Sequence, residues 1–385
     1  MLKRIGVLWG IAFLLLQHSG IEAAGWLQFD DIEIKSLQTF QSFGELHESV
    51  PVLIRAADKI MKQTPDSVVN KTVAPISGDM HDYVSSSPYW WSDPTQKGKY
   101  VSKDGRVNPE RDDPARYDHD RLDRTASNIN ILSQAYCATG REEYAAKAVE
   151  FIKVFFVNPD TRMNPNLNFA QGIPGKYDGR GSGIIDSACL IRLIDNLHML
   201  EKSAAFTEEV EAAMKAWFAS YLEWLMTSKA GLHESQAMNN HGVWYDAQAG
   251  AYALYVGRND IAASIVRQAA SKRIDQQIEP DGSMPKELAR TKSMNYTTFN
   301  LCAFITLARI GDEVGVNLWD YHSSDGRSIK AAIDYFIPYV LDTRGWQHEQ
   351  IIAYRYPGFT RFLYLAKMHY GTQEYDTAIQ KLAMD

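Results

Sequence analysis

The sequence predicts an all-α chain folded as an (α/α) toroid or barrel of helical hairpins, with long loops that form a cleft at one rim. Most segments repeat apolar residues at helical spacing, and alternating strand-like runs are nearly absent. A glycine followed at once by a polar pair and a new helix recurs at Gly140, Gly257, Gly311 and Gly371, which is typical of helical hairpins. Hairpins without a strict short period favour a barrel or toroid over a solenoid.

The N-terminal residues resemble a secretory signal peptide. Two cations precede an apolar run, Ile5–Leu16, and small residues occupy positions 23–25. The run is too short to span a bilayer as a helix, and no later stretch is long enough. We therefore expect a signal peptide over residues 1–24, one domain over 25–385, and a periplasmic or secreted protein without a membrane partner.

The helices follow from apolar periodicity, and the segments between them follow from composition. Helices are predicted over 141–156, 208–228, 259–274, 293–310 and 328–341. Three long segments rich in Pro, Gly, Asn and aromatic residues separate them, at 77–120, 158–183 and 279–291. Loops of this length in a compact domain are usually functional, so we expect them to build the cleft.

Charge and cysteine content exclude several classes of function. The net charge of −7 argues against a nucleic-acid-binding protein, because such a protein needs a basic field. Cys137, Cys189 and Cys302 lie in apolar contexts and lack metal-type spacing, so we interpret them as buried thiols. The acidic stretch 118–123 fits a solvated helix start better than a metal site, and no metal or cofactor is expected.

Three loop motifs suggest contacts with a hydroxyl-rich ligand. The stretch "SSPYWWSDP" offers Tyr89, Trp90 and Trp91 as a stacking platform for sugar rings, with loop packing as the alternative. The stretch "RMNPNLNFAQG" holds Asn166 and Gln171 in a row of amides that suits hydroxyls and carboxylates, with Asx turns as the alternative. The stretch "GRGSG" at 179–183 fits no phosphate-binding fingerprint, and we interpret it as a flexible closure.

The stretches "MNNHGVWYDAQ" and "PKELARTKSMNY" combine the groups needed to cleave a uronic-acid polymer by β-elimination. The C5 proton is α to a carboxylate and barely acidic, so donors must first neutralise that carboxylate. Asn240, His241 and Arg290 are suitable donors. Singly, a core histidine that fixes a loop is the more ordinary interpretation of His241; the combination of motifs favours catalysis.

Tyr296 is the candidate base and acid. In mannuronate and glucuronate the C5 hydrogen and the O4 leaving group share one face of the ring, so one residue can serve both. A tyrosine suits this task if nearby positive charge lowers its pKa from about 10. Guluronate places the two groups on opposite faces and calls for a second residue, for which His241 is the candidate.

Three separated blocks of sequence, in order, are similar to the alginate lyase domain family of secreted bacterial and fungal proteins, related to polysaccharide lyase family 5. They are "PNLNFAQGIPGKYDGRGSGIID", "MNNHGVWYDAQ" and "ELARTKSMNYTTFNL". The resemblance implies an (α/α) toroid and a metal-independent lyase, and we expect its substrate to be mannuronate-rich alginate. It also implies that an Asn–His pair and an Arg, here Asn240, His241 and Arg290, neutralise the uronate while Tyr296 acts as base and acid.

Substrate preference and the outer contacts are left as alternatives. Family 5 enzymes have one more residue between the arginine and the tyrosine, so Lys292 competes with Arg290 for the charge role. Glucuronan is a second candidate substrate for the same chemistry. Other classes are a glycoside hydrolase with two of the carboxylates Asp79, Asp246 and Glu287, or a noncatalytic glycan-binding protein. The expected substrate contacts are His81, Tyr89, Trp90, Trp91, Asn166, Gln171, Asn239, Trp244, Lys292 and Arg355.

Overall fold

The computed structural model describes residues 26–29, 33–35, 37, 49–354 and 357–384. Apart from short strands, this part of the chain consists of helices and loops, so the predicted all-α class is confirmed. Its described helices do not close into a barrel. The helices are α2 (Ser49–Ile60), α3 (His119–Thr139), α4 (Glu142–Ile152), α5 (Cys189–Leu200), α6 (Glu208–Thr227), α7 (Lys229–Glu234), α8 (Asn240–Tyr255), α9 (Asn259–Ala269), α10 (Asp275–Gln277), α11 (Pro285–Leu288), α12 (Ser293–Val314), α13 (Ile329–Val340), α14 (Pro357–Tyr370) and α15 (Gln373–Met384).

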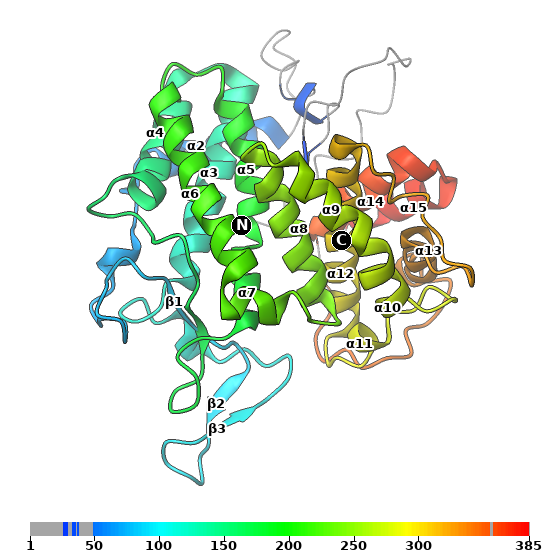
Figure 1. Cartoon of the computed structure of the whole chain (residues 1–385). Helices are drawn as coiled ribbons and strands as arrows, with labels where there is room; N and C mark the ends of the chain where they lie inside the picture. The colour runs from blue at the N-terminus through cyan, green and yellow to red at the C-terminus, as the bar shows by residue number, and fades with distance from the viewer. Residues whose placement is uncertain (1–25, 30–32, 36, 38–48, 355–356, 385) are drawn as a thin grey trace.

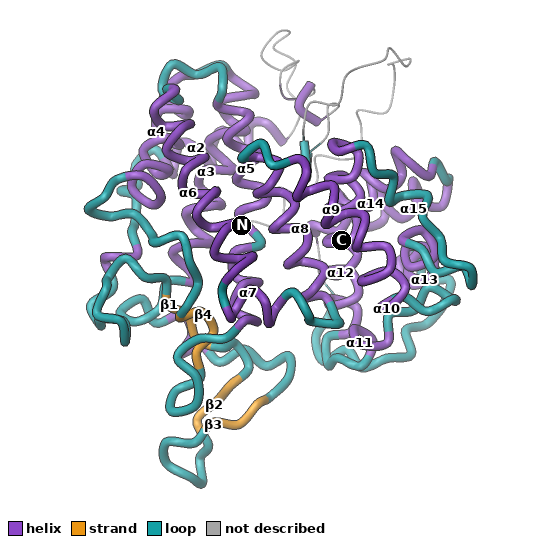
Figure 2. The backbone as a smooth tube through the Cα atoms, in the orientation of Figure 1, coloured by secondary structure: helices purple, strands orange, loops and turns teal. Residues whose placement is uncertain are grey.

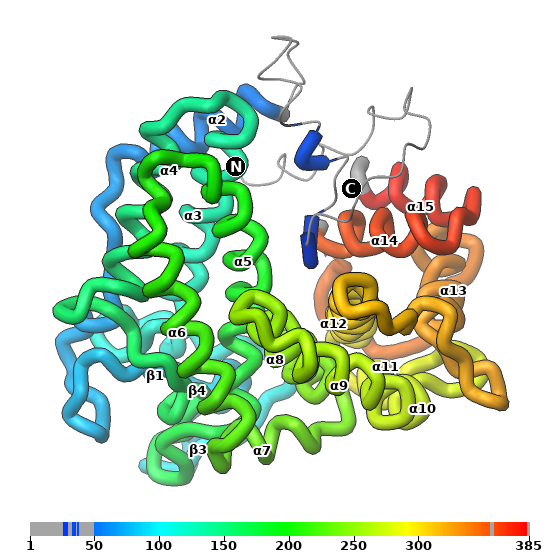
Figure 3. Tube along the Cα trace, turned by 45° about the horizontal axis from the view of Figure 1, so that its top comes forward, coloured from blue at the N-terminus to red at the C-terminus, as the bar shows by residue number. Residues whose placement is uncertain are grey.

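Helix α8 lies between two groups of helices (Figures 1 and 3). The group α2–α6 lies on one side of it, and α13–α15 lie on the other side beyond α12. Helix α8 packs against α5, α6, α9 and α12. Every residue of α8 except His241 and Leu254 is buried. The first residues of this central helix are therefore held firmly in place by the core.

The strands are short and lie inside two of the predicted loops. β1 (Val84–Ser86) pairs in parallel with β4 (Phe169–Gly172), and β2 (Trp90–Ser92) pairs antiparallel with β3 (Tyr100–Ser102). Figure 2 shows the β2–β3 hairpin projecting beyond the helices at one edge of the molecule. Pairing of β1 with β4 joins the loop at 77–120 to the loop at 158–183.

Helix positions agree with the periodicity of the sequence. The five predicted helices correspond to α4, α6, α9, α12 and α13, each of which begins within one residue of its predicted start. Gly140, Gly257 and Gly371 each adopt positive φ, at 66°, 76° and 64°, at the turn that separates two helices. Glycine pays no Cβ penalty in this left-handed region, which is why it ends these helices.

Gly311 is a correction, because the sequence predicted that a helix would end there. Helix α12 continues to Val314, and Gly315 is its left-handed cap with φ 66°. A Cβ at Gly311 would lie 2.3 Å from the carbonyl oxygen of Val316. Gly311 therefore makes room for the chain that turns back after the helix.

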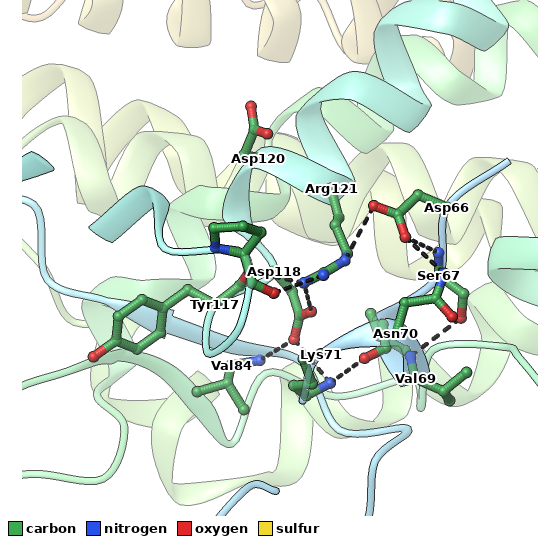
Figure 4. Close-up of polar contacts among 12 residues, drawn as sticks. Asp66, Ser67, Val69, Asn70, Lys71, Val84, Tyr117, Asp118, Asp120 and Arg121 are labelled. Atoms are coloured by element: carbon green, nitrogen blue, oxygen red, sulfur yellow. Dashed lines mark hydrogen bonds and ion pairs between the residues drawn. The ribbon is translucent and has the colours of Figure 1, made fainter. Parts of the chain in front are cut away.

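A buried ion pair fixes the segment that leads to β1 (Figure 4). Lys71 Nζ lies 3.0 Å from Asp118 Oδ2, and both side chains are fully buried. Asp118 also accepts hydrogen bonds from the Val84 backbone N–H at 3.0 Å and from Arg121 Nη1 at 3.1 Å. Lys71 also donates to the Met80 carbonyl at 2.8 Å. One carboxylate thus connects the loop before β1, the start of β1 and the first turn of α3.

Some of the sequence-based expectations lie outside the structure. The predicted signal peptide over residues 1–24 lies outside the described residues. Within the described part of the chain, no helix has both the length and the apolar character needed to cross a membrane. Cys302 is buried as expected, whereas Cys137 and Cys189 are only half-buried.

Candidate active site

A cleft of about 560 Å³ opens where the long loops meet the N-terminal ends of α8 and α12. The four candidate catalytic residues, Asn240, His241, Arg290 and Tyr296, all line it. They come from two segments about fifty residues apart that the α8–α12 packing brings together. The other lining residues are Ser87, Pro88, Tyr89, Trp90, Ser102, Asp104, Arg111, His119, Asp123, Gln171, Arg180, Ser182, Ile185, Asp186, Ala188, Cys189 and Phe299.

Tyr296 lies on the first turn of α12 and meets a second phenol. Its hydroxyl is 2.5 Å from the hydroxyl of Tyr89, which precedes β2. The guanidinium carbon of Arg290 stacks 3.6 Å from the centroid of the Tyr296 ring. A cation over the ring face is an attractive geometry and holds the phenol in one orientation. The cleft therefore presents a fixed phenolic oxygen beside a positive charge.

The pKa of Tyr296 departs from the expectation. Burial raises this pKa well above the ordinary value of about 10, and the neighbouring Tyr89 raises it further. Arg290 acts in the opposite direction, as the sequence suggested, but burial outweighs its effect. In the free protein Tyr296 is therefore protonated at neutral pH, and the phenolate is a minor species.

Arg290 is anchored by an acidic residue that the sequence did not single out. Asp104, just after β3, accepts hydrogen bonds from Arg290 Nε at 3.1 Å and from Arg290 Nη2 at 2.5 Å. The backbone N–H of Thr291 donates to the same carboxylate at 3.0 Å. Burial alone would raise the pKa of Asp104, but these hydrogen bonds prevail and lower it to about 2. The β2–β3 hairpin is thus tied to the segment that carries Arg290.

The Asn240–His241 pair is backed by two buried carboxylates. Glu287 of α11 accepts hydrogen bonds from both the backbone N–H and Nδ2 of Asn240, each at 2.7 Å. Glu234, the last residue of α7, lies 2.5 Å from Nδ1 of His241. The side chain of Asn239 caps α8 by accepting a hydrogen bond from the His241 backbone N–H at 3.3 Å. Both side chains of the pair are thereby fixed at the start of a buried helix.

Arg180 is a further cation of the cleft that the sequence analysis missed. Its Nη2 donates to Ser87 Oγ at 2.8 Å and its Nε donates to the Gln171 carbonyl at 3.0 Å. Burial lowers its pKa. The "GRGSG" stretch that contains it is not a flexible closure, because a Cβ at Gly179 would lie 2.0 Å from the Asn168 carbonyl oxygen. These glycines allow close packing, which holds the arginine in place.

The predicted substrate contacts divide into those that line the cleft and those that do not. Tyr89, Trp90 and Gln171 line it. Gln171 has φ 48° and its Nε2 donates to Asp186 at 2.9 Å, so its amide is already engaged. Arg355 lies outside the described residues. The predicted contacts that are absent from the lining of this cleft are His81, Trp91, Asn166, Asn239, Trp244 and Lys292.

Trp244 is a correction, because it belongs to the core. It is 4% exposed, and its Nε1 donates to the Phe299 carbonyl at 3.1 Å. After its first turn every residue of α8 except Leu254 is buried, and Trp244, one turn beyond His241, faces α12. The sugar-contact interpretation of Trp244 is therefore wrong.

Local partners account for the remaining residues outside the cleft. His81 Nδ1 lies 2.6 Å from the Arg162 carbonyl oxygen, and Trp91 Nε1 donates to the Arg106 carbonyl at 2.9 Å. Asn166 Oδ1 accepts from the Asn168 backbone N–H at 3.1 Å, which is the Asx turn that the sequence left as its alternative. Lys292 forms an isolated backbone bridge with Gln350. Of the two candidate cations, Arg290 is the one that lines the cleft.

The carboxylates named for a glycoside hydrolase do not face one another across the cleft. Asp246 pairs with Arg273 at 2.7 Å, and Glu287 is 1% exposed and bound to Asn240. Asp79 accepts a hydrogen bond from Asn164. None of the three lines the cleft, so they do not supply the facing pair that a glycoside hydrolase requires. Within the described ranges, no group of three or more His, Cys, Asp or Glu side chains is placed to hold a metal ion.

Comparison with known proteins gives the family. The family model described as alginate lyase matches residues 67–346. A crystal structure of an alginate lyase from Bacteroides ovatus has 37% sequence identity and a TM-score of 0.87, covering 94% of this chain and 96% of that chain. Among proteins with curated descriptions, no sequence matches this chain.

Two more distant structures share the fold. Alginate lyase A1-III from Sphingomonas species A1 has 15% identity and a TM-score of 0.56, covering 89% of this chain and 88% of that one. A His-to-Ala variant of alginate lyase A1-III complexed with a tetrasaccharide has 16% identity and a TM-score of 0.58, with the same coverage.

The helical fold, the polar cleft and these matches define a polysaccharide lyase. The chain belongs to the alginate lyase family.

Proposed function

We propose that this protein cleaves mannuronate-rich alginate by syn β-elimination and leaves a 4,5-unsaturated uronate at the new chain end. The observation that carries the proposal is the position of the Tyr296 hydroxyl in one cleft with Arg290, Asn240 and His241. This places a proton carrier beside three groups that suit a carboxylate. The tetrasaccharide bound to the A1-III variant supports an oligosaccharide ligand for the shared fold.

The reaction follows from the charges in the cleft. Asn240, His241 and Arg290 donate to the uronate carboxylate, which makes the C5 proton more acidic. The Tyr296 phenolate takes this proton, the C5 electron pair forms the C4–C5 double bond, and the C4–O4 bond breaks. The proton then passes from Tyr296 to O4 on the same face of the ring. Tyr296 ends as a phenolate, so the cycle needs no other reactant.

The supply of phenolate makes the rate sensitive to pH. Because the pKa of Tyr296 lies above its ordinary value, only a small fraction of the free protein holds the phenolate at neutral pH. We expect kcat to rise by up to about tenfold per pH unit from neutral into alkaline pH, as the phenolate fraction grows. The measurement is kcat against pH at saturating poly-mannuronate. A kcat that is flat or falls across this range contradicts the role of the phenolate as base.

An assay with three substrates tests the reaction and its preference. The protein is incubated with poly-mannuronate, poly-guluronate and glucuronan while the absorbance of the conjugated double bond and the number of reducing ends are followed. We expect both to rise together, fastest with poly-mannuronate. Reducing ends without the double bond contradict elimination. A faster rate with glucuronan, which differs from mannuronan only at C2, keeps the mechanism but overturns the substrate.

The remaining proposals concern location and architecture. We infer that residues 1–24 are removed on export and that the lyase acts in the periplasm or outside the cell, where a polymer is accessible. We also infer that residues 25–385 form one domain, whose helical hairpins belong to the (α/α) toroid class. The structural likeness to the Bacteroides ovatus lyase over 94% of this chain supports a single domain.

A further inference from the structure

The contact between Glu234 and His241 constrains the histidine more than a packing contact would. Glu234 Oε1 lies 2.5 Å from Nδ1 of His241. The Glu234 side chain is 3% exposed, whereas that of His241 is 22% exposed. The carboxylate thus lies behind the ring, away from solvent, and the ring itself borders the cleft.

This contact determines which ring nitrogen carries a proton. An ionised carboxylate has only acceptor sites, so a nitrogen at this distance must donate to it. Nδ1 therefore holds a hydrogen, and in the neutral ring Nε2 is left with a lone pair. Because Nδ1 is turned toward the buried carboxylate, Nε2 is the nitrogen left to meet a ligand. A lone pair would repel the uronate carboxylate that His241 is proposed to bind.

We propose that Glu234 is a positioning residue for the elimination, which keeps a proton on Nδ1 of His241 so that the ring takes up a second proton, on Nε2, when a uronate carboxylate binds. The inference rests on the proposed function and adds the protonation state of one of its donors. The imidazolium lies between two anions, Glu234 behind and the substrate in front. Binding of a polyuronate is thus coupled to uptake of a proton.

Other charged groups around the ring do not replace Glu234. Glu287 of α11 also acts electrostatically on His241, but its oxygens are engaged by Asn240. Arg290 lines the same cleft as a cation and opposes protonation of the ring, although Asp104 balances its charge. Arg180 is a further cation near Glu234.

The other titratable side chains that line the cleft are Tyr89, Arg111, His119, Asp123, Asp186, Cys189 and Tyr296. Tyr296 of α12 is uncharged at neutral pH, because burial raises its pKa. Among the described residues, Glu234 is the carboxylate that lies within hydrogen-bond distance of the His241 ring.

Proton counting tests the proposal without altering Glu234. Calorimetry of mannuronate oligomer binding to the Tyr296→Phe variant, in buffers of different ionisation enthalpy, gives the number of protons taken up. At about pH 8, where an ordinary imidazole is mostly neutral, we expect uptake approaching one proton per site. No uptake at that pH overturns the proposal.

Kinetics of two matched variants provide the second test. Glu234→Gln removes the carboxylate that contacts the His241 ring, which can titrate. Glu287→Gln removes the carboxylate that contacts the Asn240 amide, which cannot. In Glu234→Gln we expect the rise of KM with pH to begin about one pH unit or more lower than in the wild type, a roughly tenfold loss of affinity over that interval. In Glu287→Gln we expect the pH at which KM begins to rise to stay within a few tenths of a pH unit of the wild-type value. Glu234→Asp keeps the charge, so it should show the wild-type dependence of KM on pH.

Failure of this proposal is distinct from failure of the proposed function. Equal shifts in Glu234→Gln and Glu287→Gln, or no shift in either, contradict the role of Glu234 while the wild type still forms the double bond. A wild type that forms no double bond from any polyuronate contradicts the function itself, whatever the proton count.

Discussion

Tyr296→Phe is expected to lower kcat on poly-mannuronate by roughly 10³-fold or more, because it deletes the one group that both takes and returns the proton. The phenyl ring remains, so the stacking contact with Arg290 at 3.6 Å and the shape of the cleft are retained. Affinity for the polymer should therefore change by only a few-fold. The measurement combines the initial rate of double-bond formation with binding of a mannuronate oligomer.

Tyr177→Phe is the matched control. Tyr177 is 50% exposed and does not line the cleft, so loss of its hydroxyl should leave kcat within a factor of about two. A Tyr296→Phe variant that keeps more than about a tenth of the wild-type rate would remove Tyr296 from the chemistry, because a proton carrier contributes at least about 10²-fold.

The Asp118→Asn variant is expected to lose about 3–5 kcal/mol of unfolding free energy, because it leaves the buried charge of Lys71 without its partner. The carboxylate also holds Val84 and Arg121, so the amide forfeits charge-assisted hydrogen bonds. Denaturant unfolding followed by circular dichroism measures the loss. Activity should fall as well, because Asp118 adjoins His119, which lines the cleft.

Asp120→Asn provides the control on the same helix. Asp120 pairs with Arg124 at 3.2 Å with both side chains about half exposed, and such pairs contribute less than about 1 kcal/mol.

A double replacement, Lys71→Met with Asp118→Leu, removes both charges. Burial already lowers the pKa of Lys71 and raises that of Asp118 against their mutual attraction, so the double variant should recover the part of the loss that comes from the unpaired charge. It should not recover the part that comes from the Val84 N–H and Arg121, which lose their acceptor. Equal stability of Asp118→Asn and Asp120→Asn would contradict this account.

The helical skeleton could be predicted because each helix carries its own signal. Apolar periodicity located the starts of five helices, and three of the four hairpin glycines do end helices. Gly311 failed because a glycine can serve packing as well as capping, and the sequence shows only the residue type. The same ambiguity explains why the sequence analysis did not identify Arg180. The neighbouring glycines were interpreted as flexible, but in the structure they are closely packed.

The site was predicted less completely than the fold. Asn240, His241, Arg290 and Tyr296 lie in two short motifs whose residue types point to one chemistry, and the structure brings them to one cleft. Their carboxylate partners carry no local signal. The chain offers 47 acidic residues, and only the fold selects Asp104 as the partner of Arg290, Glu234 as the partner of His241 and Glu287 as the partner of Asn240.

Charge balance in the cleft also lay beyond the sequence. The expectation of a lowered Tyr296 pKa weighed the nearby cation and could not weigh burial, which is the larger effect. The prediction that Trp244 contacts the substrate was wrong for a related reason. Its position one turn from His241 does not indicate which side of α8 packs against other helices. Both errors come from quantities that depend on neighbours distant in the sequence.

A crystal structure of the Tyr296→Phe variant with a mannuronate oligomer bound tests the central claim most directly. We expect the uronate carboxylate to contact Asn240, His241 and Arg290, and a phenolic oxygen restored at position 296 to fall about 3–3.5 Å from C5 and on the same face of the ring as O4. A carboxylate directed away from Arg290, or a ring whose opposite face is turned toward position 296, would contradict the account.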